Sequence, residues 1–221
     1  MQYQYQSQGQ QLGATALPTQ SLLAHVLGIS ALGFCITALA AWLFPGIPFG
    51  GGLIAMLAGF GLLFGCMAAR NNEALSLVLF YAFTFCEGLG IAPVITQYVQ
   101  TSGPGVVTDA ALTTGLGMFA LGAIVYATGL DLRRFQGYVS LALMGLIVLG
   151  IVSIFVRFIH PEVYAYLVLA IFTAYVLIDF ARIRAGGGGA TPVMLAVSIY
   201  LDALNIFLAL LQIFGGRRRV S

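Results

Sequence analysis

Seven long apolar runs, separated by short polar or glycine- and proline-containing breaks, dominate this sequence. Each run is close to the roughly 20 residues that a helix needs to cross about 30 Å of hydrocarbon. The runs do not alternate between polar and apolar residues, as the strands of an outer-membrane barrel would. We therefore expect an all-α membrane protein, a seven-transmembrane helix bundle with spans at residues 22–44, 50–69, 74–99, 109–130, 138–159, 162–183 and 193–214.

The charge content excludes several functional classes. Charged residues make up 7% of the chain, whereas soluble domains carry about 25%, so an ordinary soluble enzyme is ruled out. The formal net charge of +2 provides no basic surface for nucleic acid. The lipid bilayer is therefore the expected environment of nearly the whole chain.

The two ends of the chain differ from the spans between them. Residues 1–21 are Gln-rich, and we expect a disordered tail there, while residues 215–221 form a basic C-terminal tail. Cytoplasmic loops of membrane proteins are enriched in arginine and lysine. Five of the nine arginines fall on the side of the N-terminus, which we therefore expect to be cytoplasmic; they are Arg70, Arg133, Arg134, Arg182 and Arg184.

Three of the acidic residues have structural explanations. Asp109 follows Thr108 at the start of the fourth span, where we expect it to cap the helix. Glu162 follows Pro161 in the first turn of the sixth span, where a negative charge suits the helix dipole. Asp131 is expected in a loop.

Asp179 and Asp202 are different, because both lie within apolar spans. Asp202 is about 15 Å along the seventh helix, counted from Pro192, and Asp179 is about 9 Å deep at the end of the sixth. The two helices are antiparallel neighbours joined by a short glycine-rich loop, so the carboxyl groups enter from the same side and can meet. Arg70, at the end of the second span on that side, is the expected cation to latch onto one of them.

Polar residues extend this pair along both helices. Ser198 and Asn205 lie one turn before and after Asp202, which places the three on one stripe of the seventh helix. Tyr175 and Arg182 are spaced to form the matching stripe on the sixth helix.

The pair has a defined chemistry. Two carboxyl groups in a low-dielectric site cannot easily both ionise, so Asp179 and Asp202 are expected to titrate as a unit and to respond to pH. When ionised they offer hard oxygen ligands, which with Asn205 could hold Ca²⁺ weakly. We expect Ca²⁺ as a transported or weakly bound ion and no tightly bound cofactor. The structural alternative is that Asp179 and Asp202 form a hydrogen-bonded pair whose only role is to fix the register of the two helices.

Glu87 is a third acid within a span, about 20 Å along the third helix. Acids inside a bilayer are rare and mostly functional, so Glu87 is a candidate for lining a pathway. It is equally explained as a protonated side chain bonded to Thr84 or to a carbonyl freed near Pro93. The sequence leaves both interpretations open.

The segment Ser198–Leu211 resembles the hallmark segment of the Bax inhibitor-1 family. The resemblance covers residues 22–214 in the number and order of the spans, and it is most specific in the last third of the chain. Other matching features are Leu177-Ile178-Asp179, Arg184, Arg70, Gly90 and Pro93.

The resemblance implies a bundle with the seventh helix central and a pH-sensitive calcium leak. Asp179 and Asp202 would be the di-aspartyl sensor, and Arg70 would latch Asp179 in the closed state. Bacterial members lie in the inner membrane with a cytoplasmic N-terminus. Some relatives pair a glutamate of the second helix with an arginine of the seventh, and Gly59 and Gln212 stand at those positions here.

Two other functional classes remain. Some bacterial relatives bind and modulate an AAA membrane protease, so a non-transporting regulator is an alternative, with the Gln-rich tail as a handle. An intramembrane aspartyl protease also needs two aspartates. However, Asp179 follows Ile178, Asp202 follows Leu201, and no Pro-Ala-Leu motif comes later, so we do not expect an enzyme.

Overall fold

The computed structural model describes residues 19–156 and 159–218, and within them it consists of helices and short connections. Seven of the helices in this part of the chain are long and apolar enough to cross a membrane, which confirms the predicted fold class. They are α1 (Thr19–Leu43), α2 (Phe49–Ala68), α3 (Glu73–Ser102), α4 (Gly105–Thr128), α5 (Gln136–Val156), α6 (Pro161–Arg184) and α7 (Pro192–Arg218).

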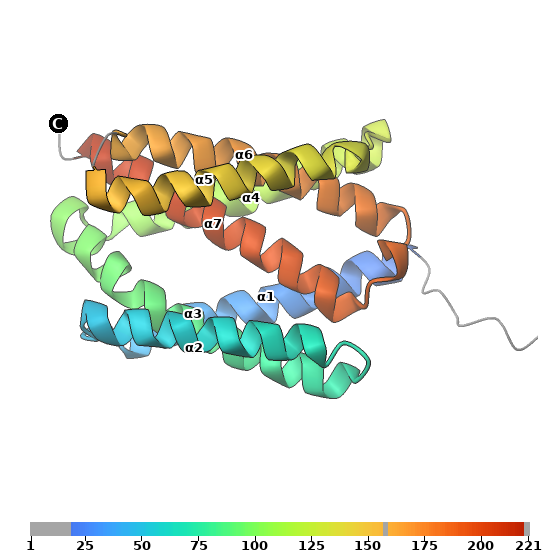
Figure 1. Ribbon diagram of the computed structural model, residues 1–221, viewed down its shortest axis with the longest axis horizontal. Coiled ribbons are helices and arrows are strands. Elements are labelled where there is room, and N and C mark those ends of the chain that lie inside the picture. The colour runs from blue at the N-terminus through green and yellow to red at the C-terminus, as the bar shows by residue number, and fades with distance from the viewer. Residues whose placement is uncertain (1–18, 157–158, 219–221) are drawn as a thin grey trace, which may run out of the picture.

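The helices form two groups with α7 between them. Helices α1, α2 and α3 lie together on one side of the molecule and α4, α5 and α6 on the other, while α7 crosses obliquely from one group toward the other (Figure 1). Of the most apolar stretch of α7, 67% is buried inside the protein, compared with 6% for α5. The seventh helix is therefore central, as predicted, and α5 is peripheral.

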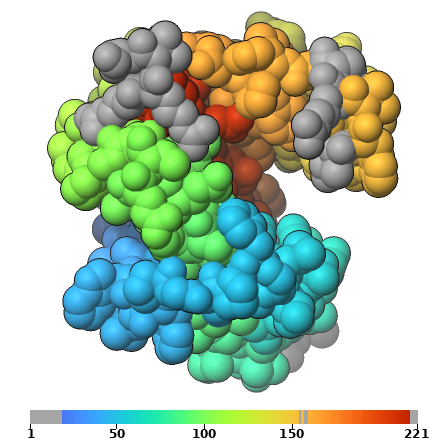
Figure 2. Space-filling view, turned by 90° about the vertical axis from the view of Figure 1, so that its left-hand side faces the viewer, coloured from blue at the N-terminus to red at the C-terminus, as the bar shows by residue number. Residues whose placement is uncertain are grey.

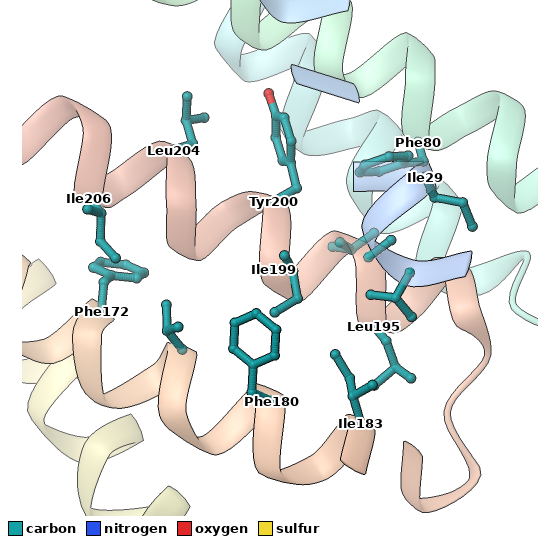
Figure 3. Packing of buried hydrophobic residues seen from close by; sticks show 14 of the residues in the cluster. Ile29, Phe80, Phe172, Phe180, Ile183, Leu195, Ile199, Tyr200, Leu204 and Ile206 are labelled. Carbon is teal, nitrogen blue, oxygen red and sulfur yellow. The ribbon is translucent and has the colours of Figure 1, made fainter. Parts of the chain in front are cut away.

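Large apolar side chains join α7 to its neighbour α6. Phe172 of α6 lies by Ile206 of α7, and Phe180 lies by Ile199, so the two helices interlock along most of their length (Figure 3). Close packing of this kind holds helices together in lipid, where there is no hydrophobic effect between them. It also fixes the rotation of each helix and hence the direction of its polar residues.

Glycines allow the first three helices to approach closely. A side-chain carbon at Gly88 of α3 would overlap the carbonyl oxygen of Thr37 and lie 2.7 Å from Cβ of Ala40, both in α1. At Gly52 of α2 it would lie 3.0 Å from the Pro93 ring of α3. Small residues at such contacts let helix backbones pack tightly in membranes.

Helix α3 continues through Pro93 and then bends toward α4 (Figure 1). Proline lacks the N–H that would bond to the preceding turn, and its ring pushes that turn away, so helices kink there. The second half of α3 thereby leaves α2 and closes one end of the space between α1 and α4.

Several boundaries differ from those expected. Helix α4 begins at Gly105, because Pro104 with φ −65° is already in helical geometry, so Asp109 lies inside the helix and the prediction that it caps the helix is wrong. Helix α1 begins at Thr19 and α7 continues to Arg218, so residues 19–21 and 215–218 are helical rather than tails. The rest of both predicted tails lies outside the described residues.

Candidate functional site

The turn between α6 and α7 brings the two aspartates to the same depth. It contains four glycines, Gly186 to Gly189, with φ between 60° and 86°. This left-handed region is readily adopted only by glycine, so the sequence permits a reversal that other residues would strain. The last turns of α6 consequently lie beside the first turns of α7.

Asp179 and Asp202 meet inside the bundle, as their spacing predicted. Their side chains are 6% and 4% exposed, and the two carboxyl groups are close enough for the charge of each to act on the other. Oxygen Oδ2 of Asp202 is buried and has no hydrogen-bond partner. An ionised carboxylate only accepts hydrogen bonds, so a bond between the two requires that one of them carries a proton.

Two of the four supporting residues join this pair. The Ser198 hydroxyl donates to the carbonyl oxygen of Met194 at 3.5 Å and lies near Asp179, and the positive charge of Arg182 is close enough to act on that carboxyl group. Arg182 is also tied to the glycine turn, because its Nε donates to the carbonyl oxygen of Gly187 at 3.2 Å.

The other two residues are directed elsewhere. The Tyr175 hydroxyl donates to Ser140 of α5 at 2.9 Å, so Tyr175 links α6 to α5 rather than facing Asp202. Asn205 donates through Nδ2 to the carbonyl oxygen of Leu201 in its own helix at 2.8 Å. Its side chain is half-buried on the same stripe as Asp202, with the amide oxygen left to accept.

Arg70 is not in contact with either aspartate in this structure. It is exposed, in the turn that follows α2. An ion pair joins Arg133 to Asp131, at 2.7 Å, and does not involve Arg70. Helix α2 packs mainly on α3, whereas the aspartates lie between α6 and α7, so an Arg70 latch requires its long side chain to reach across from the first group of helices.

Glu87 lies apart from the aspartate pair. Its side chain is 5% exposed, and Oε1 is 3.4 Å from the place where a Cβ on Gly59 of α2 would stand. No hydrogen bond joins Glu87 to Thr84 among the described residues, and the Thr84 hydroxyl donates to the carbonyl oxygen of Tyr81 at 2.9 Å. Glu87 therefore marks a second buried acidic position, between α2 and α3.

A cluster of hydroxyl groups near Glu87 was not predicted from the sequence. Oγ1 of Thr37 in α1 lies 2.7 Å from the hydroxyl of Tyr200 in α7 and 2.8 Å from the carbonyl oxygen of Thr84 in α3. Tyr200 is completely buried. The sequence feature that could have indicated this cluster is Thr37, a polar residue in the middle of an apolar span. Its role becomes clear only when the helix that it contacts is known.

The family model for inhibitors of apoptosis-promoting Bax1 matches residues 19–219. The chain belongs to the Bax inhibitor-1 family. An uncharacterised protein of Pseudomonas aeruginosa is 29% identical to it over 88% of both chains. An uncharacterised membrane protein of Vibrio cholerae is 28% identical over 74% of both chains, and an uncharacterised protein of Campylobacter jejuni is 30% identical over 69% of this chain and 67% of its own.

This member of the Bax inhibitor-1 family has a third buried acid, Glu87, on α3, where its carboxyl group lies beside Gly59 of α2. On α7, Gln212 donates through Nε2 to the carbonyl oxygen of Pro161 at 3.0 Å. Gly59 and Gln212 are both uncharged, so these two positions form no ion pair between α2 and α7.

Half-buried polar residues recur along α7 at every seventh position, Ser198, Asn205 and Gln212. Seven residues are close to two helical turns, so the three share one face of α7. This helix is visible in a hollow between α6 and the blue and cyan helices α1 and α2 (Figure 2). The sequence interpretation included Ser198 and Asn205, and the period of seven could have added Gln212.

The acid pair does not form a ready-made metal cage. Among the described residues there is no group of three or more His, Cys, Asp or Glu side chains that could hold an ion. Ca²⁺ takes six to eight oxygen ligands, so two carboxyl groups would need backbone carbonyls, the Asn205 amide oxygen and water. Such a site suits weak, reversible contact with a cation.

Proposed function

We propose that this membrane protein is a pH-sensitive calcium leak channel or transporter, gated by Asp179 and Asp202. The observation that carries the proposal is the proximity of these two carboxyl groups, both buried inside the bundle with one oxygen of Asp202 unpartnered. Intramembrane acids are costly and are retained mainly for function. Calcium and protons would be the ions that compete for this pair.

The competition has a simple basis. When one proton is shared, the two carboxyl groups hold each other and cannot both face a cation. Loss of that proton leaves two negative charges in contact, and a divalent cation relieves their repulsion. The glycine turn that joins α6 to α7 supports this, because it allows the two helices to separate slightly without strain.

Arg70 is proposed as the latch of the closed state. It lies in the turn after α2, on the same side of the membrane as the turn between α6 and α7, together with Arg133, Arg134, Arg182 and Arg184. That excess of arginine supports a cytoplasmic N-terminus, in the inner membrane of a bacterium. The structure described here, with Arg70 exposed and away from Asp179, would then correspond to an unlatched state.

The test is calcium flux into proteoliposomes of the purified protein between about pH 5 and pH 8, where a shared proton can be lost. We expect Asp179→Asn and Asp202→Asn each to lose the pH dependence and most of the flux. Asp131→Asn is the matched control, since Asp131 is an exposed loop acid. Unchanged pH-dependent flux in the double variant would disprove the proposal.

Absence of flux from folded wild-type protein would instead favour a non-transporting regulator of an AAA membrane protease. That role would be tested by deleting residues 2–18 and following the turnover of the protease's substrates. A tail deletion that leaves turnover unchanged would count against the regulatory role.

A further inference from the structure

A row of polar side chains follows α7 from one end of its span to the other. It begins at Thr191 and continues through Ser198, Asn205 and Gln212, all of them half-buried. The rise from Thr191 to Gln212 is about 32 Å at 1.5 Å per residue, and the hydrocarbon core is about 30 Å thick. We propose that these four residues, the α7 oxygen stripe, form the route by which a partly hydrated calcium ion crosses the bundle. The inference rests on the calcium function proposed above.

The stripe lies on the face of α7 that is open to a hollow in the molecule. This hollow lies beside α7, between α6 and the helices α1 and α2 (Figure 2). On the other face of α7, Phe207 lines an apolar groove between α1 and α4. With 3.6 residues per turn, Asn205 points about 160° away from Phe207. Helix α7 therefore presents an apolar face to the groove and its polar residues to the hollow.

The polar side chains of the stripe present oxygen atoms. Asn205 and Gln212 each donate from the amide nitrogen to a backbone carbonyl oxygen, at 2.8 and 3.0 Å, and each keeps its amide oxygen as an acceptor. Ser198 uses its only proton in a bond to a carbonyl oxygen at 3.5 Å, so its oxygen can also accept. Amide oxygens and water are among the ligands of Ca²⁺, so the stripe is suited to a hydrated cation.

A hydrocarbon chain is a poor occupant for this face of α7. Polar groups without hydrogen-bond partners cost free energy in an apolar environment. The lipid-facing helix α5 shows what such an environment selects, because its exposed side chains between Leu141 and Val152 are apolar. On α7 a polar residue recurs at every seventh position instead, so water is the better match to this face.

The stripe passes the acid pair midway along its length. Ser198 lies near Asp179, and Asp202 follows Ser198 by about one helical turn. The unpartnered Oδ2 of Asp202 is a further oxygen at this depth. A calcium ion that moves along the stripe would therefore reach the two carboxyl groups after about half of its path.

An acidic side chain lies at the end of the stripe that is remote from the glycine turn. Oε1 of Glu162 is 2.9 Å from the place where a Cβ on Gly216 would stand, and Gly216 follows Gln212 by about one turn. Negative charge at an entrance raises the local concentration of cations. Gln212 is then the first amide oxygen of the stripe that an ion entering at this end meets.

Single cysteines test whether the stripe is open to water. Cys35 and Cys86 are replaced by alanine, and Cys66 is kept because it is completely buried. Asn205→Cys then probes the stripe, and Phe207→Cys, at nearly the same depth, is the matched control on the groove side. A charged, membrane-impermeant methanethiosulfonate reacts with the thiolate, which forms in water. We expect Asn205→Cys to react at least tenfold faster than Phe207→Cys in proteoliposomes, and Ca²⁺ to slow only the reaction of Asn205→Cys.

Two substitutions of Gln212 separate its oxygen from its hydrogen bond. Gln212→Leu and Gln212→Glu both remove the Nε2 donor to Pro161, but only Gln212→Glu keeps side-chain oxygens. We expect Gln212→Leu to reduce calcium flux into proteoliposomes at least fivefold and Gln212→Glu to retain the wild-type flux or exceed it. An equal loss in the two variants would overturn the role of the oxygen.

The two measurements distinguish failure of the route from failure of the calcium function. Wild-type flux together with equal reaction rates of Asn205→Cys and Phe207→Cys would overturn the route alone, because lipid or a partner helix would then fill the hollow. Fast reaction of Asn205→Cys without wild-type flux would disprove calcium transport, and this inference with it.

Discussion

Thr37 and Tyr200 join the first and last helices through hydroxyl oxygens 2.7 Å apart. The same Thr37 hydroxyl lies 2.8 Å from the carbonyl oxygen of Thr84, so α1, α3 and α7 meet at one buried polar point. The Tyr200 ring packs edge-on against Phe80 and Phe83 of α3, with centroids 5.6 and 5.7 Å away. This contact sets the position of α7 two residues before Asp202.

Removal of Thr37 should therefore destabilise the protein more than removal of the Tyr200 hydroxyl. Thr37→Val leaves the Tyr200 hydroxyl buried without a partner, which typically costs about 1–3 kcal/mol. Tyr200→Phe removes one hydrogen bond while Thr37 keeps its backbone acceptors, so we expect about 1 kcal/mol. Unfolding in mixed micelles measures both, and a larger loss for Tyr200→Phe would contradict this view of the cluster.

Substitution of Gly88 should separate α1 from α3. Gly88→Ala places a methyl group against the Thr37 carbonyl and Ala40, and overpacking of this kind costs about 1–3 kcal/mol. Gly61→Ala on α2 is the control, because its new methyl group meets nothing within 4 Å. We expect the control to match wild type or to gain up to about 1 kcal/mol from better helix propensity. Equal stabilities of the two variants in thermal unfolding would refute the close contact.

Arg70→Gln should alter flux without altering stability. Arg70 is exposed and makes no ion pair in this structure, so its loss should leave the unfolding free energy within about 0.5 kcal/mol of wild type. If Arg70 latches the closed state, its removal should raise calcium flux in proteoliposomes. Arg133→Gln is the control, since Arg133 is paired with Asp131. Flux that rises equally in both variants would argue for a general charge effect rather than a latch.

The pair of Asp131 and Arg133 should not contribute to pH dependence near neutrality. Hydrogen bonds from the side chain and the backbone N–H of Arg133 lower the pKa of Asp131 from its ordinary 3.8 to about 2. A lowered pKa stabilises the folded state above about pH 3.8, and this contribution is lost only as the pH falls toward 2. Stability curves of wild type and Asp131→Asn should thus be parallel between about pH 5 and pH 8. Curves that diverge in that range would show that Asp131 titrates there.

The helices were predictable because each span is a local property of the sequence. Seven apolar runs of sufficient length, separated by polar breaks, determine seven helices in a bilayer. The ends of the helices were less predictable than their number. Helix α4 begins at Gly105 rather than at residue 109, because the geometry of Pro104 allows the helix to start earlier. Helix ends depend on such local competition, which hydropathy does not record.

The proximity of Asp179 and Asp202 was also predictable, from depth and from the short glycine turn. A hairpin of two helices has few possible arrangements, so equal depth nearly determines proximity. The surroundings of Tyr175 and Arg70 were not predictable, since the Tyr175 hydroxyl donates to Ser140 of α5 and Arg70 is exposed in the turn after α2. Both depend on helices distant in the sequence.

The sequence by itself thus determined how many helices there are and at what depth each acid lies, because hydropathy and helical rise are local quantities. Only the tertiary structure decided how each helix is rotated and which helices touch. That is why Thr37 meets Tyr200, why Glu87 lies against Gly59, and why α1 and α4 stay far enough apart to leave a groove. In lipid these choices come from the fit of side chains between helices, which no single span encodes.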